Sequence, residues 1–93
     1  MNKLMRKIIA AFGLHSPGGS YKVNVSDIVI PVEFKESPPR FKKMMHKREY
    51  FRRNDRFESK IVLSRDFLLI DGYTSYLLAK ENGMKYVEAY FVN

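Results

Sequence analysis

Polar and apolar residues alternate along two stretches of the chain, and this period of two predicts β-strands at residues 21–25 and 85–92. Two shorter apolar runs, residues 60–64 and 67–71, flank a two-residue turn and predict a hairpin. A further apolar run at residues 28–30 predicts another strand, which ends at a proline. The pattern therefore predicts five short strands.

Three other stretches place apolar residues at helical spacing, and they predict helices at residues 3–12, 40–53 and 73–82. Pro39 is expected to open the second helix, because proline is well tolerated in the first turn. Gly83 follows the third helix and is expected to adopt the left-handed conformation that ends many helices.

The predicted elements run helix, strand, strand, helix, strand, strand, helix, strand, which indicates the α+β class with a small mixed sheet and flanking helices. We expect residues 1–20 to form an N-terminal amphipathic helix and flexible connector, and residues 21–93 to form the folded domain. The apolar stripe of the first helix can pack on its own domain, which is the default, pair with a second copy in a homodimer, contact another protein, or lie on a membrane surface. Its candidate contact residues are Leu4, Ile8, Ile9 and Phe12.

The composition restricts the chemistry that the chain can perform. Hydrophobic residues make up 45% of the 93 residues, which favours a folded domain over a disordered tail. The absence of cysteine excludes disulfides, thiolate metal sites and cysteine nucleophiles, and it agrees with a reducing cytoplasm. No stretch approaches the roughly 20 apolar residues of a membrane span, so we expect a cytoplasmic protein.

The net charge of +7 is concentrated in one segment. Residues 40–60 contain nine basic and three acidic side chains, which favours a polyanionic partner such as nucleic acid, with DNA preferred to RNA. A solvated helix face remains the alternative interpretation of the same charges. The candidate nucleic-acid-binding residues are Lys42, Lys43, Lys47, Arg48, Arg52, Arg53 and Arg56.

Asp71 and Gly72 join a buried strand to the last helix, and they predict a sharp corner that directs backbone N–H groups of the helix toward a ligand. A hairpin turn is the alternative, but the helical pattern and the Gly83 stop favour the strand-to-helix corner. Asp71 is expected to cap the helix rather than to bind metal or act as a base, because no second carboxylate lies at a suitable spacing. His15 and His46 also lack metal-ligand spacing, so no metal site is predicted.

Several short segments occur in a fixed order between residues 21 and 93: Val25-Ser26-Asp27-Ile28, Ser37-Pro38-Pro39-Arg40, Ile61-Val62-Leu63, Leu69-Ile70-Asp71-Gly72-Tyr73, Leu78-Ala79-Lys80-Glu81-Asn82-Gly83 and Val87-Glu88-Ala89-Tyr90. This succession resembles the superfamily of ParB N-terminal domains and sulfiredoxins. The resemblance implies the same fold, a bacterial or phage source, and a ligand site at the Asp-Gly corner.

In that superfamily the functional residues follow the corner glycine: Glu-Arg-Arg in ParB proteins that bind CTP, and Cys-His-Arg in sulfiredoxins. Here the three positions are Tyr73, Thr74 and Ser75, so sulfiredoxin activity is excluded by the missing thiol. With those arginines missing, the charge that neutralises a phosphate is expected to come from Arg40, which matches the family's Pro-x-Arg-like segment, or from Lys42 and Lys43. No cofactor is required by the sequence, and a nucleotide with Mg²⁺ is the candidate ligand. The resemblance implies phosphate or nucleotide contacts from Arg40, Asp71, Gly72, Tyr73, Thr74 and Ser75.

Three functions remain open at this point. The favoured one is a binding module that holds nucleic acid or a nucleotide phosphate through the basic helix and the corner. The second is the nuclease or nucleotide hydrolase that the family label implies, although no complete catalytic constellation is visible and catalytic residues are not assigned. The third is a regulatory protein-interaction module with a degenerate ligand site. ParB proteins carry a helix-turn-helix DNA reader after this domain; none follows before Asn93, so sequence-specific binding of a partition site is expected to need another subunit.

Overall fold

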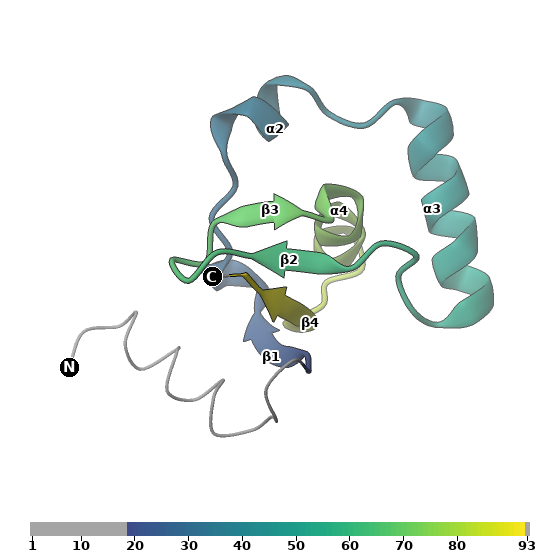
Figure 1. The fold of residues 1–93 in the computed structure, drawn as a ribbon. Coiled ribbons are helices and arrows are strands. Elements are labelled where there is room, and N and C mark those ends of the chain that lie inside the picture. The colour runs from purple at the N-terminus through teal and green to yellow at the C-terminus, as the bar shows by residue number, and fades with distance from the viewer. Residues whose placement is uncertain (1–18, 93) are drawn as a thin grey trace.

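The computed structural model describes residues 19–92, which contain a four-stranded mixed sheet in the order β1-β4-β2-β3 (Figure 1). Strand β4 pairs antiparallel with β1 and parallel with β2, and β2 pairs antiparallel with β3. The strands are β1 (Tyr21–Asn24), β2 (Ile61–Leu63), β3 (Leu69–Asp71) and β4 (Tyr86–Phe91). The mixed sheet and its helices confirm the predicted α+β class, and the hairpin of β2 and β3 is confirmed as well.

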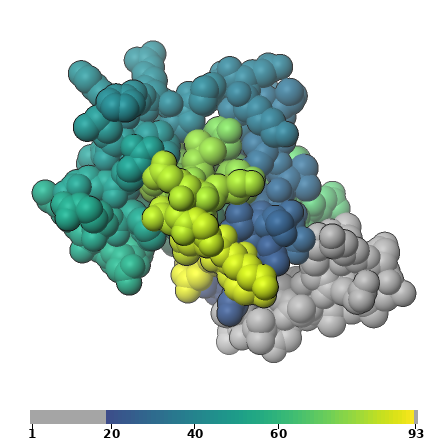
Figure 2. Space-filling model, turned by 180° about the vertical axis from the view of Figure 1, so that it is seen from behind, coloured from purple at the N-terminus to yellow at the C-terminus, as the bar shows by residue number. Residues whose placement is uncertain are grey.

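Within residues 19–92, three α-helices and one 3-10 helix accompany the sheet: η1 (Val25–Asp27), α2 (Val32–Glu36), α3 (Phe41–Asn54) and α4 (Tyr73–Glu81). Helix α4 contacts β2 and η1, and α3 contacts α4 rather than lying flat on the sheet. Seen from behind, α4 and the turn after it lie between α3 and the blue segment that includes α2 (Figure 2). Gly83 has a φ of +66°, which confirms the predicted left-handed residue after α4.

The core lies on the face of the sheet that α4 covers, because alternate residues of each strand point to the same side. Val23, Val87 and Ala89 are buried from β1 and β4, while Lys22 and Glu88 between them are exposed. Ile61, Leu63, Leu69, Leu78 and Ala79 complete the most deeply buried part of this core. The opposite face of β4 is therefore left to polar and aromatic side chains.

The prediction of a strand at residues 28–30 is wrong. Val29 makes only an isolated parallel bridge to Leu68, and the chain around it forms helices that the pattern did not reveal. The oxygen Oδ1 of Asn24 accepts the Ser26 N–H at 3.0 Å and caps η1, and Pro31 is the N-cap of α2. A proline with fixed φ favours a helix start, which explains why the apolar run does not continue as a strand.

The first turn of α3 also differs from the prediction, because its N-cap is Arg40 and Pro39 lies one residue before the cap. The helix ends at Asn54, and Asp55 adopts the left-handed conformation with a φ of +53°. The predicted helix at residues 3–12 and most of the connector that follows it, up to residue 20, lie outside the described residues.

Candidate functional site

Gly72 builds the corner between β3 and α4. Its φ is +90°, and a Cβ atom at this position would lie 2.3 Å from the carbonyl oxygen of Lys60 and 2.8 Å from the Cα of Ile61. The backbone therefore crosses β2 at a distance that only glycine allows. Because α4 begins at Tyr73, the predicted strand-to-helix corner is confirmed.

Asp71 does not cap α4, so that prediction is wrong. The N-cap position is Gly72, which has no side chain, and Oδ1 of Asp71 accepts the Gly72 N–H at 2.8 Å. The carboxylate stabilises the turn one residue before the helix. The N–H groups of the first turn of α4 consequently receive no side-chain cap from the N-cap residue.

A pocket of about 230 Å³ opens at this corner and joins parts of the chain that are far apart in sequence. Helix α2, the segment before α3, one side of α3 and the start of α4 all contribute to it. It is lined by Phe34, Ser37, Pro39, Lys43, Lys47, Ser59, Asp71, Gly72, Tyr73 and Thr74. Its volume is below the roughly 300–1,000 Å³ of drug-sized ligand sites, so it accommodates a phosphate group rather than a whole nucleoside triphosphate.

Two lysines of α3 supply the positive charge of the pocket. Nζ of Lys47 donates to Oε1 of Glu58 at 2.6 Å and to Oγ of Ser59 at 2.8 Å, and the Lys47 side chain is only 14% exposed. The bond from Lys47, with a further one from His46, lowers the pKa of Glu58. Lys43 forms no ion pair with any carboxylate in residues 19–92, so its charge is available to a ligand. Arg40 is not among the residues that line the pocket.

The two hydroxyl residues after the corner have different positions. Thr74 lines the pocket, although its residue is only 5% exposed. Ser75 is 1% exposed, and its Oγ donates to the carbonyl oxygen of Ser59 at 2.6 Å. This bond fixes α4 to the segment before β2. The Ser75 hydroxyl is therefore occupied by a structural contact, while Thr74 is placed beside the pocket.

Aromatic rings form one wall of the corner. The rings of Phe34 and Tyr73 stack with centroids 5.4 Å apart, and those of Tyr73 and Tyr76 stack at 6.2 Å. The short helix α2, which the sequence did not predict, contributes Phe34 to this wall. The wall therefore depends on contacts between α2 and α4 that no local pattern reveals.

Much of the positive charge on α3 is neutralised by carboxylates. Arg48 donates two hydrogen bonds to Glu81, at 2.8 and 2.9 Å, and thereby lowers the Glu81 pKa. Arg52 and Arg53 both donate hydrogen bonds to Glu49, and these bonds lower the Glu49 pKa to about 2. The bond from Arg52 has the larger effect on the pKa. Of the seven predicted nucleic-acid-binding residues, Lys42, Lys43 and Arg56 form no ion pair with a carboxylate among the described residues.

No group of three or more metal-ligating side chains occurs within residues 19–92. Over the same residues, no helix is both long and apolar enough to cross a membrane.

Comparison with known proteins places this geometry in a known class. No family model and no curated protein matches the sequence. The pNOB8-like ParB N-domain has a similar solved structure, with a TM-score of 0.62 and 26% identity over 80% of this chain. The C2221 form of a Pnob8-like ParB N-domain matches with a TM-score of 0.65 and 24% identity over 77% of this chain. Each match spans 28% of the solved chain. The protein therefore contains a divergent ParB-like domain.

Sequence reasoning identified the corner and only part of the rest of the pocket. Lys43 was predicted both as a nucleic-acid contact and as one candidate cation for the corner, Lys47 only as a nucleic-acid contact, and both line the pocket at the start of α4. Their spacing of four residues, which puts two side chains on one face of a helix, was the available signal. Nothing in the sequence indicated that Phe34 and Ser59 would line the same pocket.

Proposed function

We propose that this ParB-like domain binds a phosphate group, carried by a nucleotide or by nucleic acid, in the pocket at the start of α4. The observation that supports the proposal best is the convergence of Lys43, Lys47 and the first turn of α4 on one pocket. The ParB-like fold adds support. The sequence resemblance to that superfamily implied a ligand site at this same corner.

The chemistry of the pocket suits a phosphate. A helix N-terminus offers free N–H donors and about half a positive charge, and nine residues are enough for α4 to provide both. The Thr74 hydroxyl adds a neutral donor, and the ammonium of Lys43 adds a charge-assisted bond. Lys47 contributes less charge, since Glu58 already neutralises it. These groups replace the arginines that follow the glycine in related CTP-binding domains.

Asp71 suggests that a metal ion accompanies the phosphate. Its carboxylate is among the pocket-lining groups and would repel an anion placed directly beside it. Mg²⁺ commonly bridges one or two protein carboxylates and the phosphates of a nucleotide. We therefore favour a nucleotide with Mg²⁺ over a bare anion. Among the described lining residues Asp71 is the one carboxylate, whereas two-metal cleavage uses several, so we propose binding rather than hydrolysis.

For a polynucleotide, we assign the main phosphate contacts to the cations of α3 and its flanks that lack a carboxylate partner among residues 19–92. These are Arg40, Lys42, Lys43 and Arg56. The paired arginines Arg48, Arg52 and Arg53 would have to break existing bonds before they contact DNA. Such binding would weaken steeply with salt, by a slope of about −0.9 in log K per phosphate contact on duplex DNA.

A thermal-shift assay with two neighbouring lysine variants tests the pocket. Lys43→Ala removes a lining residue, and Lys42→Ala removes an equal charge from the adjacent exposed position that does not line it. CTP, ATP, GTP and orthophosphate are each added with and without Mg²⁺. A ligand at ~100 times its dissociation constant adds about 2.7 kcal/mol to the free energy of unfolding.

We expect nucleotides to stabilise the protein only when Mg²⁺ is present. Lys43→Ala should lower the affinity for the ligand at least several-fold, whereas Lys42→Ala should be stabilised as much as the parent. If none of the ligands stabilises the protein, the phosphate pocket is rejected. Equal losses in both lysine variants would also contradict it, because they would show attraction by net charge alone.

A further inference from the structure

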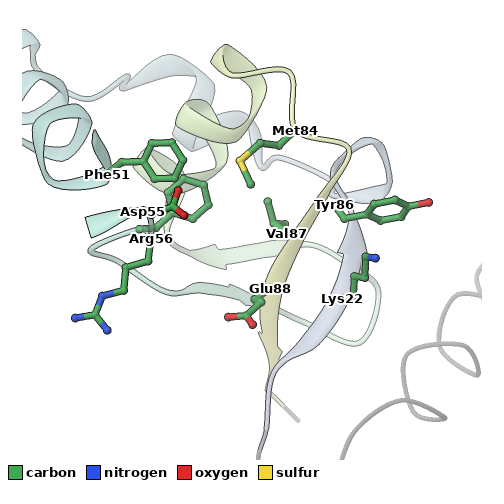
Figure 3. A pocket seen from close by; sticks show the side chains of 9 residues that line it. Lys22, Phe51, Asp55, Arg56, Met84, Tyr86, Val87 and Glu88 are labelled. Atoms are coloured by element: carbon green, nitrogen blue, oxygen red, sulfur yellow. The ribbon is translucent and has the colours of Figure 1, made fainter. Parts of the chain in front are cut away.

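A second concave surface lies beside β4, away from the start of α4. One hollow of about 780 Å³ lies between the end of α3 and the first half of β4 (Figure 3). A second hollow of about 360 Å³ continues along the segment that enters β2. The two share Arg56, Phe57 and Glu88, so together they form one groove, which we call the β4 groove.

The outward face of β4 gives this groove two tyrosines. Tyr86 and Tyr90 line its two hollows, and the alternation of the strand puts both side chains opposite the buried Val87 and Ala89. Tyr86 is 42% exposed. Four residues of strand separate the two rings by about 13 Å. This spacing suits a short chain of stacking groups better than a single small ligand.

A lysine ammonium lies over each tyrosine ring. Nζ of Lys22 is 4.6 Å and Nζ of Lys85 is 5.6 Å from the Tyr86 centroid, and Nζ of Lys60 is 4.8 Å from the Tyr90 centroid. The exposed Tyr86 ring and the half-buried Tyr90 ring therefore each have a cation within a few ångströms. A long lysine side chain can move from the ring to a neighbouring anion without a change in the backbone.

The acidic residues of the groove reduce this charge without cancelling it. Glu58 is already bound to Lys47, whereas Glu88 lies opposite Lys22 in the register of β1 and β4 and offsets part of the charge there. Asp55 is the remaining carboxylate of the lining. Against these, the cations on or beside the groove that have no carboxylate partner in the described chain are Lys22, Arg56, Lys60 and Lys85.

We infer that the β4 groove binds single-stranded nucleic acid, with bases stacked on Tyr86 and Tyr90 and phosphates held by the lysines beside them. Aromatic rings on a sheet face together with cations along a groove are the combination that single-strand binding uses. A duplex cannot use it, because its bases are already stacked on one another. The aromatic rings and the cations together favour a nucleic acid over a second protein as the occupant.

This inference does not depend on the phosphate pocket at α4. Neither tyrosine and none of the three ring-contacting lysines lines that pocket. Variants at the two sites therefore separate the two proposals, since Lys43→Ala removes the proposed phosphate contact and leaves the groove intact.

Fluorescence anisotropy with labelled twelve-nucleotide oligo(dT) and oligo(rU) tests the groove. The test variant is Tyr86→Ala with Tyr90→Ala, and the matched control is Tyr86→Phe with Tyr90→Phe, which keeps both rings. Each stacked base contributes roughly 1–3 kcal/mol, so we expect the alanine variant to lose about fivefold to 150-fold in affinity per ring. We expect the phenylalanine variant to bind within about twofold of the parent, and a matching duplex to compete poorly. The comparison of oligo(dT) with oligo(rU) decides whether DNA or RNA is preferred.

A second readout follows base stacking directly. The protein has six tyrosines and no tryptophan, so tyrosine emission is observable, and stacking on Tyr86 and Tyr90 should quench it. The thermal unfolding curve of each variant, followed by circular dichroism, confirms that it is folded. The inference is overturned if the parent binds neither oligonucleotide or if the alanine variant binds as well as the parent. It is also overturned if sedimentation shows that the parent and the phenylalanine variant are dimers and the alanine variant is a monomer.

Discussion

At the scale of single residues, Gly72 determines whether the corner can form. Gly72→Ala introduces a Cβ where the Lys60 carbonyl oxygen lies 2.3 Å away, and it places alanine at a φ of +90°. We expect a loss of more than about 2 kcal/mol in the free energy of unfolding, because both strain and a backbone clash contribute. Urea denaturation followed by circular dichroism measures this change.

Gly83→Ala is the matched control for that substitution. Gly83 also has a positive φ, of +66°, but a Cβ added there would meet no atom within 4 Å among the described residues. The left-handed conformation alone then lowers the stability by about 1–2 kcal/mol. Equal losses in the two variants would show that the contact with β2 contributes nothing.

Ser75 and Thr74 are adjacent hydroxyl residues with different expected roles. Ser75→Ala removes the donor that lies 2.6 Å from the half-buried Ser59 carbonyl oxygen, so we expect a loss of about 1–3 kcal/mol in stability. Its affinity for phosphate should be unchanged once the protein is folded. Thr74→Val should weaken phosphate binding and change the stability less. Titration calorimetry measures the phosphate affinity of both variants, and urea denaturation measures their stability. If Ser75→Ala abolished binding in a fully folded protein, the assignment of a structural role to Ser75 and a binding role to Thr74 would be wrong.

At the scale of elements, α3 contains ion pairs between its own residues whose carboxylate titrates in acid. The hydrogen bonds from Arg52 and Arg53 lower the Glu49 pKa from 4.5 to about 2. Because the folded-state pKa is below the unfolded value, the contribution is fully present above pH 4.5 and is lost as the pH falls toward 2. All three side chains are substantially exposed, so salt reduces the effect.

We therefore predict that the stability of the parent falls more steeply than that of Glu49→Gln between pH 4.5 and about 2. Urea denaturation at several pH values, at low and high salt, gives the two curves. Glu58 and Glu81, whose pKa values are also lowered, remain in both proteins and contribute to both curves. Parallel curves at low salt would show that the Glu49 pairs do not stabilise α3.

The elements also show how far a sequence pattern can be trusted. The hairpin, α3, α4 and the last strand have clear periodicity, and all four are present. The run at residues 28–30 has strand-like composition but does not form a strand. Val29 makes backbone hydrogen bonds with Phe67 and Leu69, and these amount to a single isolated β-bridge. Its neighbours form η1 and α2, because the Asn24 cap and Pro31 decide the local conformation. Five or fewer residues carry too few periods for a pattern to identify such elements.

At the scale of the whole molecule, the sequence predicted part of the phosphate pocket and nothing of the β4 groove. The corner glycine is a local signal, whereas the approach of α3 to the start of α4 depends on tertiary contacts. Counting charges also overestimated the basic face of α3, since Glu81, far along the chain, neutralises Arg48. The groove beside β4 is visible only in three dimensions, because the lysines over its tyrosines come from β1, the segment before β2 and the segment before β4.

The two surfaces predict different responses of the molecule to a mononucleotide and to a polynucleotide. The phosphate pocket is lined by Lys43 and the β4 groove by Tyr86, and the linings have only Ser59 in common among the described residues. Substitutions at separate, independent sites act additively in free energy, within about 0.5 kcal/mol. For CTP, we expect Lys43→Ala to lower the affinity and Tyr86→Ala to have no effect.

For a single strand of about 30 nucleotides, long enough to contact both surfaces, we expect each substitution to weaken binding and the double variant to show the sum of the two free-energy changes. Lys43→Ala should also reduce the salt slope by about 0.7, the value for one phosphate contact on a single strand, whereas Tyr86→Ala should leave it nearly unchanged. Fluorescence anisotropy at several salt concentrations supplies both quantities. If Tyr86→Ala weakened CTP binding as much as Lys43→Ala did, the two surfaces would act as one site, and their separation would be wrong.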